Sequence, residues 1–222
     1  MVGRHELKFH INTADYAQLR SRLRIVAKPD ENALADGAYM IRSLYFDNYS
    51  DKAVMEKLSG ISKREKYRLR YYNGDTSFIR LERKSKENLL CYKESAMISA
   101  EQCTALLEGN HNILNAPETP LFMGLYIKIH TEHLRPKNIV DYRREAFAFQ
   151  AGNVRVTFDS SIRASNSISG FLQPSLTTIP VANTIVMEIK YDGYIPDIIS
   201  NLVQIDRRSL TEFSKYAAAR LM

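Results

Sequence analysis

Strict alternation of charged and apolar residues recurs along most of this chain and constrains its fold more than any other feature. Residues 5–11 read HELKFHI, residues 66–72 read KYRLRYY, and residues 78–86 read FIRLERKSK. Successive side chains of a strand point to opposite faces, so this period of two indicates strands with one charged and one apolar face. The Asn73-Gly74 pair between the last two segments predicts a hairpin.

Eight segments are predicted as strands, which is enough for a small closed barrel. They are residues 5–11, 41–47, 66–72, 78–86, 90–97, 138–150, 154–159 and 184–192. Helices are predicted at 14–27 and 51–59, after Ser99, and at 119–133, 196–204 and 209–221. Thr13, Ser50 and Ser209 are expected to open the first, second and last of these helices. Residues 165–184 are expected to form a long loop.

The charged strand faces are mostly basic, and they could either face water or point into a barrel. A solvated face usually mixes the two signs more evenly than these faces do. The opposite faces carry large apolar groups such as Phe9, Leu69 and Phe158, which amphipathic helices could cover. We therefore expect an α+β fold in a single domain spanning residues 1–222. It would be an eight-stranded antiparallel β-barrel, a tunnel with a basic lumen and helices packed on the outside.

A confined ring of cations repels itself and persists when a polyanion neutralises it. Arg and Lys suit phosphate groups through a planar fork and a point charge, respectively. The totals of 31 Lys and Arg against 25 Asp and Glu agree with an acidic ligand. RNA binding would interleave aromatic groups with these charges. Most strand aromatics fall on the other face, although Tyr72 and Tyr142 share the basic one, so no nucleic-acid partner is expected.

A few carboxylates accompany the cations on the predicted inner face. Glu6, Glu82 and Glu188 could be ion-pair partners that hold the basic side chains apart, or they could bind a metal. Glu188 lies near the middle of its strand and is the best candidate ligand for Mg²⁺ or Mn²⁺, which need only one or two carboxylates beside phosphate oxygens. The sequence has no P-loop, GxGxxG or GxSxG motif.

The sequence also bears on location. Its two cysteines, Cys91 and Cys103, match no metal or disulfide spacing. It shows no apolar leader and no run of about 18 apolar residues that would span a membrane. A cytoplasmic protein is therefore expected.

The ordered set of strand motifs resembles the VTC-type polyphosphate polymerase domain, a member of the CYTH-like triphosphate tunnel metalloenzyme superfamily. The resemblance runs from Arg4 to Arg220. One departure concerns the ExExK pattern of the CYTH triphosphatases, because Arg4 stands where the first Glu would be. The motifs lie at residues 4–8, 43–48, 64–70, 82–84, 142–147, 154–159, 188–190 and 213–216.

This resemblance implies transfer of the γ-phosphate of ATP, or of another nucleoside triphosphate, to a growing inorganic polyphosphate chain with Mn²⁺ or Mg²⁺. The implied catalytic residues are Arg68, Arg70, Arg144, Arg155 and Lys84. The implied phosphate-binding residues are Lys8, Lys57, Lys93, Ser214 and Lys215, and Lys190 is added because alternation places it on the same face as Glu188. The resemblance implies Glu188 as a metal ligand, and Glu6 and Glu82 are further candidate ligands because of their place on the predicted inner face.

Two alternatives remain open at this point. One is an inorganic triphosphatase or nucleotide hydrolase on the same fold, and the other is a non-catalytic polyanion-binding module. The sequence does not identify a membrane protein that would receive the product.

Overall fold

One large antiparallel sheet dominates the computed structural model, which describes residues 3–117, 119–204 and 209–222. Ten strands belong to the sheet within this part of the chain. They are β1 (His5–Ile11), β2 (Lys28–Pro29), β3 (Ala38–Asp47), β4 (Lys63–Tyr72), β5 (Asp75–Glu87), β6 (Leu90–Ile98), β7 (Arg135–Phe149), β8 (Val154–Ser165), β9 (Ile179–Ala182) and β10 (Ile185–Tyr191).

All eight predicted strands are present, and they follow the order β1-β10-β8-β7-β3-β4-β5-β6 across the sheet. The two additional strands are short: β2 pairs with β7 and β9 pairs with β8. The segment predicted as a long loop therefore contains β9 and a 3₁₀ turn at Ile168–Gly170. Four residues are too few to show a clear alternation, which explains why the sequence analysis missed β9.

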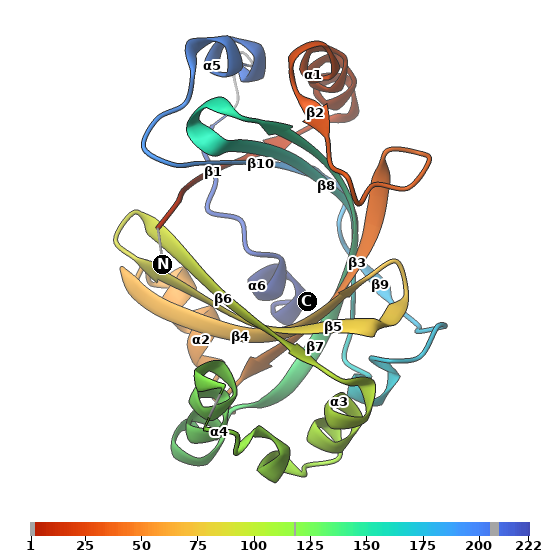
Figure 1. Cartoon of the computed structure of the whole chain (residues 1–222), viewed down its shortest axis with the longest axis vertical. Coiled ribbons are helices and arrows are strands. Elements are labelled where there is room, and N and C mark those ends of the chain that lie inside the picture. The colour runs from red at the N-terminus through yellow and green to blue at the C-terminus, as the bar shows by residue number, and fades with distance from the viewer. Residues whose placement is uncertain (1–2, 118, 205–208) are drawn as a thin grey trace.

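The sheet curves strongly, and its two end strands approach each other (Figure 1). Arg4, just before β1, forms an antiparallel bridge with Cys91 of β6. The amide of Arg4 donates to the Cys91 carbonyl at 3.0 Å, and the amide of Cys91 donates to the Arg4 carbonyl at 2.9 Å. The inner face of the curved sheet is thus surrounded by strands.

The predicted hairpin between β4 and β5 is confirmed. Asn73 and Gly74 connect the strands with φ angles of 52° and 75°. Positive φ at both positions is what a primed two-residue turn requires, and Asn and Gly accept it most readily. The turn sets the register that places Lys66 opposite Lys84 and Arg68 opposite Glu82.

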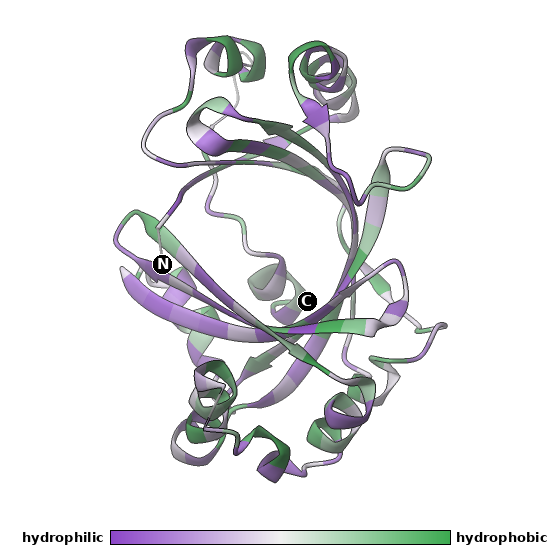
Figure 2. Ribbon diagram, in the orientation of Figure 1, coloured by the Kyte–Doolittle hydropathy of each residue, from purple (hydrophilic) through white to green (hydrophobic). Residues whose placement is uncertain are grey.

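The outer face of the sheet is apolar and is covered by helices, as predicted. Helices α1 (Thr13–Val26) and α5 (Asp197–Val203) cover one part of it, around buried Phe147, Phe158 and Met187. Helices α3 (Ala100–Leu107) and α4 (Pro120–Glu132) cover another part, around Leu44 and Leu69. Figure 2 shows hydrophilic and hydrophobic residues interleaved along the strands. No helix among the described residues is long and apolar enough to cross a membrane.

The last helix does not follow the prediction of helices on the outside. Tyr216, Ala217 and Ala219 of α6 (Lys215–Arg220) pack in one buried cluster with Tyr45 and Tyr142, whose side chains lie on the inner face. Figure 1 shows α6 through the opening of the curved sheet. This short helix therefore covers part of the inner face.

Three predicted helix starts are wrong by one or more residues. Asn12 caps α1, since its Oδ1 accepts from the amide of Asp15 at 2.8 Å. Asp51 precedes α2 (Lys52–Leu58), whose first two amides donate to the side chains of Asn48 and Asp47. Ser214 caps α6, so the last helix does not begin at Ser209. Residues 205–208 lie outside the described part of the chain. Ser99 caps α3 as predicted, in a capping box with Gln102.

Candidate functional site

The inner face of the sheet encloses a strongly basic cavity of about 280 Å³. Its lining contains eleven Lys and Arg side chains but only two carboxylates, Glu6 and Glu188. Nine of these cations lie on strands, where the period of two sends every second side chain inward, whereas Arg4 precedes β1 and Lys215 begins α6. The eleven cations are Arg4, Lys8, Lys66, Arg68, Arg70, Lys84, Lys93, Arg144, Arg155, Lys190 and Lys215.

One wall of this cavity, formed by β4, β5 and β6, is organised around Glu82. Arg68 Nε donates to Glu82 Oε2 at 2.7 Å, Lys93 Nζ lies 2.6 Å from Oε1, and Arg70 Nη1 lies 3.7 Å from Oε2. Burial alone would raise the pKa of Glu82, but Arg68, Arg70 and Lys93 outweigh it and lower this pKa below its ordinary value. Glu82 therefore remains ionised and orders three cations of the predicted site.

The wall formed by β7 and β8 is organised around a carboxylate that the sequence analysis did not single out. Asp159 is fully buried and accepts hydrogen bonds from Arg144 Nε and Nη2 at 2.6 and 2.7 Å. Lys215, the first residue of α6, forms an ion pair with the same carboxylate. Burial opposes ionisation, yet Arg144 and Lys215 lower the pKa of Asp159 to about 2. A fork-to-fork pair of this kind fixes the guanidinium plane of Arg144.

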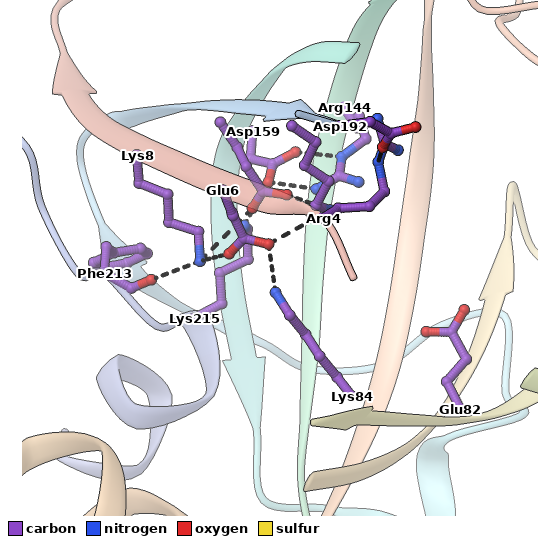
Figure 3. A network of polar contacts seen from close by, with 12 residues as sticks. Arg4, Glu6, Lys8, Glu82, Lys84, Arg144, Asp159, Asp192, Phe213 and Lys215 are labelled. Carbon is purple, nitrogen blue, oxygen red and sulfur yellow. Dashed lines mark hydrogen bonds and ion pairs between the residues drawn. The ribbon is translucent and has the colours of Figure 1, made fainter. Parts of the chain in front are cut away.

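Glu6 and Glu188 lie between the two walls, on neighbouring strands β1 and β10. Lys8 Nζ is 2.7 Å from Glu6 and 3.7 Å from Glu188, and Lys190 forms ion pairs with both carboxylates. Lys84 reaches across from β5 and donates to Glu6 at 2.6 Å. Figure 3 shows Lys8 and Lys84 converging on Glu6, with Glu82 standing apart. Although burial opposes it, the surrounding lysines hold the pKa values of Glu6 and Glu188 well below their usual range.

Arg155 stands at the rim of the cavity, with a side chain 39% exposed. It forms an ion pair with Asp30 and donates to the hydroxyl of Tyr39 at 2.9 Å. Asp30 comes from the loop after β2, where no strand pattern could have indicated it. The guanidinium of Arg155 therefore remains accessible to a ligand from outside.

A second cavity of about 320 Å³ adjoins the first, and both are lined by Lys8, Lys66, Lys84 and Ser214. It holds Lys57 of α2, which was predicted to bind phosphate. Lys57 forms an ion pair with Glu212, and the hydroxyl of Ser214 is engaged at the start of α6. The predicted phosphate-binding set is thus spread over two adjoining cavities, with Lys57 in the second and Lys93, Lys190 and Lys215 in the first.

Lys66 and Tyr45 face each other on the inner side, and neither was among the residues predicted for the site. Lys66 Nζ lies 5.6 Å from the centre of the Tyr45 ring, and Arg68 Nη1 donates to the Tyr45 hydroxyl at 3.2 Å. Burial would raise the pKa of Tyr45, but Arg68 and Lys66 lower it to about 7. Alternation along 66–72 places Lys66 on the basic face, whereas its proximity to Tyr45 depends on strand pairing that the sequence does not show.

The carboxylates of this site suit a divalent cation bound together with phosphate. In the described ranges no three His, Cys, Asp or Glu side chains gather as a complete protein cage. Glu6 and Glu188 share Lys8 and Lys190 as partners, so the two carboxylates lie close together. Glu188 Oε1 is buried, and its one ion-pair partner in the described residues is Lys190. Two carboxylates plus phosphate oxygens fit the needs of Mg²⁺ or Mn²⁺.

Comparison with known protein families identifies the family of this chain. The VTC domain family matches residues 3–222 of the sequence, so the chain belongs to this family. No curated protein matches the sequence.

Several solved structures are similar at low sequence identity. The PH1012 protein of Pyrococcus horikoshii OT3 is 15% identical, with a TM-score of 0.49 and coverage of 97% of this chain and 98% of that one. A conserved hypothetical protein of Pyrococcus furiosus is 11% identical, with a TM-score of 0.49 and coverage of 97% and 99%. A candidate adenylate cyclase of Bacillus halodurans is 13% identical, with a TM-score of 0.48 and coverage of 90% and 87%.

Proposed function

We propose that this protein is a metal-dependent polyphosphate polymerase, which transfers the γ-phosphate of ATP to the end of a polyphosphate chain inside a tunnel. The observation that carries the proposal is the excess of positive charge in the central cavity, where eleven cations have only six carboxylates of the described residues as ion-pair partners. Such an imbalance is costly without a polyanion to neutralise it. Membership of the VTC domain family supports the same class of ligand.

The tunnel in this proposal is the space inside the curved sheet. Its strands form a continuous hydrogen-bonded path from β1 to β6, and the Arg4–Cys91 bridge joins the two ends. The central cavity and its neighbour share several lining residues, so they would form successive parts of one passage. A chain of phosphates could lie along this passage while its end reacts in the central cavity.

Four arginines are proposed to bind the β- and γ-phosphates of ATP: Arg68, Arg70, Arg144 and Arg155. Phosphoryl transfer passes through a loose transition state in which charge spreads over the phosphoryl oxygens, so positioning and electrostatic stabilisation supply most of the catalysis. Glu82 holds Arg68 and Arg70 on one wall, and Asp159 holds Arg144 on the other. These carboxylates would keep the guanidinium groups preorganised before substrate binds.

The lysines of the lumen are proposed to orient the acceptor phosphate and neutralise the product. A terminal oxygen of the acceptor chain attacks the γ-phosphorus, a new P–O–P linkage forms, and the bond between the γ-phosphorus and the β,γ-bridging oxygen breaks. ADP leaves with that oxygen, so no protein nucleophile is required. The residues proposed for this role are Lys8, Lys84, Lys93, Lys190 and Lys215 in the central cavity, with Lys57 and Ser214 further along.

Glu188, with Glu6 beside it, is proposed to hold Mn²⁺ or Mg²⁺. When bound, such a cation neutralises charge on the phosphate oxygens that it contacts. Glu82 was a third candidate ligand, but it does not line the central cavity, and Arg68, Arg70 and Lys93 surround its carboxylate. We therefore propose that Glu82 positions arginines and that Glu188 and Glu6 serve the metal.

The experiment that tests this proposal is to incubate the protein with ATP and Mn²⁺, with and without a short polyphosphate primer, and to separate the products on a gel. A ladder of chains with ADP is expected. Orthophosphate without a ladder would instead indicate a triphosphatase on the same fold. Polyphosphate binding without ATP consumption would leave only a binding module.

Arg144 and Arg143 provide a matched pair of variants for the same assay. They are neighbours on β7, but Arg144 lines the cavity and Arg143 forms an ion pair with Asp36 outside it. Arg144→Ala should abolish most of the ladder, whereas Arg143→Ala should retain it.

Because ATP is the proposed substrate, we also propose that the protein works in the cytoplasm, with polyphosphate and no nucleic acid as its partner.

A further inference from the structure

Lys66 differs from every other cation of the central cavity. Each of the other ten has a carboxylate oxygen within 4.0 Å, supplied by Glu6, Glu82, Asp159, Asp30, Asp192 or Glu188. Lys66 has no ion pair and no side-chain hydrogen bond within residues 3–117, 119–204 and 209–222. Its charge is therefore the one in this lining that the described carboxylates leave unpaired.

The surroundings of Lys66 make this lack of a partner costly. Lys66 on β4 lies directly opposite Lys84 on β5, and Lys84 lies opposite Lys93 on β6, so three lysines form a row across the sheet. Like charges placed opposite one another destabilise a sheet. Lys84 and Lys93 are compensated by Glu6 and Glu82, respectively. A ligand that supplies negative charge would explain why Lys66, at the end of this row, has no carboxylate partner.

Lys66 also occupies a distinctive position along the proposed passage. It lines both the central cavity and the adjoining cavity that holds Lys57. A phosphate chain that extends from one cavity into the other must pass the lining residues that they share. Lys8 and Lys84 are also shared, but Glu6 engages both of them. Lys66 is left with its charge available at this junction.

The charged and titratable groups around Lys66 agree with an anion site. They are Tyr45 on β3, Arg68 on the same strand, Lys84 on β5 and Lys8 on β1. Burial lowers the pKa of Lys66, Tyr45 opposes this, and Lys84 and Lys8 lower it further, to about 7. A bound phosphate would restore the protonated form, because a neighbouring negative charge stabilises the ammonium group.

We propose that Lys66 forms a phosphate subsite at the junction of the two cavities, where it binds an internal phosphate of a polyphosphate chain that is longer than the central cavity holds. This inference rests on the proposed function only in its choice of ligand. The subsite should contribute to binding of long chains and not to binding of a triphosphate, which the central cavity can accommodate with its paired arginines and lysines.

The test is isothermal titration of the full chain with inorganic tripolyphosphate and with long-chain polyphosphate, in the absence of ATP. Lys66→Met should weaken long-chain binding about tenfold or more, the usual effect of losing one charge-assisted contact, and leave tripolyphosphate binding within about twofold. Lys66→Arg should restore long-chain binding. Lys63→Met is the matched control, because Lys63 lies on the same strand with a side chain 83% exposed, and it should bind both ligands like the wild type.

Two results would overturn the inference. Unchanged long-chain binding in a folded Lys66→Met protein would show that no subsite exists, and equal weakening for both ligands would place Lys66 in the triphosphate site. Lys66→Met could also weaken binding by destabilising the protein, which a lower unfolding temperature would reveal. In that case Lys66→Arg decides, and its failure to restore long-chain binding would count against the subsite. The assay uses no ATP, so this subsite and the polymerase reaction can fail separately.

Discussion

The two faces of the curved sheet use the same strands for different purposes, and β4 shows the contrast within three residues. Leu69 points outward, is fully buried and packs under helices α3 and α4 with Leu44 and Leu81. Arg68 and Arg70, on either side of it, line the central cavity. Apolar burial on the outer face stabilises the fold. The crowded cations of the inner face repel one another, and we propose that they serve to bind a ligand.

This contrast means that stability and activity should respond to different substitutions. A change on the outer face should lower the free energy of unfolding and leave the chemistry intact in the folded protein. A change on the inner face should lower activity with a smaller effect on the free energy of unfolding, provided that the carboxylate partner of the altered cation keeps another cation beside it. Neighbouring residues of one strand can therefore separate the two effects.

Leu69→Ala should have the largest effect on stability. The substitution deletes a fully buried side chain and leaves a cavity under α4, which should lower the free energy of unfolding by about 2–5 kcal/mol. Urea denaturation followed by circular dichroism would measure this. The rate of ADP formation should remain near the wild-type value at temperatures where the variant is folded. A loss of rate without a loss of stability would contradict the view that the outer face serves stability and the inner face serves activity.

Arg68→Ala should have the largest effect on rate. Losing one donor that stabilises transition-state charge costs about 2–4 kcal/mol, or about 30- to 1000-fold in kcat. Glu82 would keep Arg70 and Lys93 as partners, so the free energy of unfolding should change much less than in Leu69→Ala. Steady-state kinetics would measure kcat, and urea denaturation would measure the free energy of unfolding. An Arg68→Ala enzyme with normal kcat would remove this arginine from the proposed mechanism.

Glu188→Gln should separate the two proposed kinds of carboxylate. Glutamine is a weaker ligand than a carboxylate for Mn²⁺, so the Mn²⁺ concentration for half-maximal activity should rise about tenfold or more. Glu82→Gln should lower activity by disturbing the arginines but leave that Mn²⁺ concentration unchanged. Activity measured over a range of Mn²⁺ concentrations would decide the matter, and an identical shift in both variants would contradict the assignment.

Binding of polyphosphate should weaken modestly as the pH rises through about 7. Lys66 and Tyr45 lie together, and each has a pKa lowered to about 7, so the pair loses a proton as the pH rises through this value. This loss makes the lumen less positive, and a several-fold loss of affinity between pH 6 and 8 is expected. Titrations with long-chain polyphosphate would detect it. A double variant, Tyr45→Phe with Lys66→Arg, should show a smaller slope, and an unchanged slope would argue against these two groups.

The inward positions were predictable because the period of two determines which face a side chain occupies. Lys8, Arg68, Arg144 and Glu188 all follow from alternation along a strand, and the structure lines the central cavity with them. Their pairing could not be predicted in the same way. That Arg144 meets Asp159, and that Lys84 meets Glu6 across the lumen, depends on register and on the curvature of the whole sheet.

Parts of the site outside regular strands were harder to predict. Asp30 belongs to a loop, and its contact with Arg155 brings together residues 125 positions apart. The start of α6 was placed too early, because residues 210–213 contain no signal that distinguishes an extended segment from a helical one. In the structure Leu210 forms a β-bridge with Phe9, which competes with helix formation there. Tertiary pairing thus overrode the local pattern.

The most direct test of the central claim is ³¹P NMR spectroscopy of the protein with ATP and Mn²⁺, with the metal chelated before recording. If the basic lumen elongates a polyphosphate chain, the signal of internal phosphates should grow as ATP is converted to ADP, with little orthophosphate. Conversion of ATP to ADP with a matching amount of orthophosphate, and no internal-phosphate signal, would contradict the account.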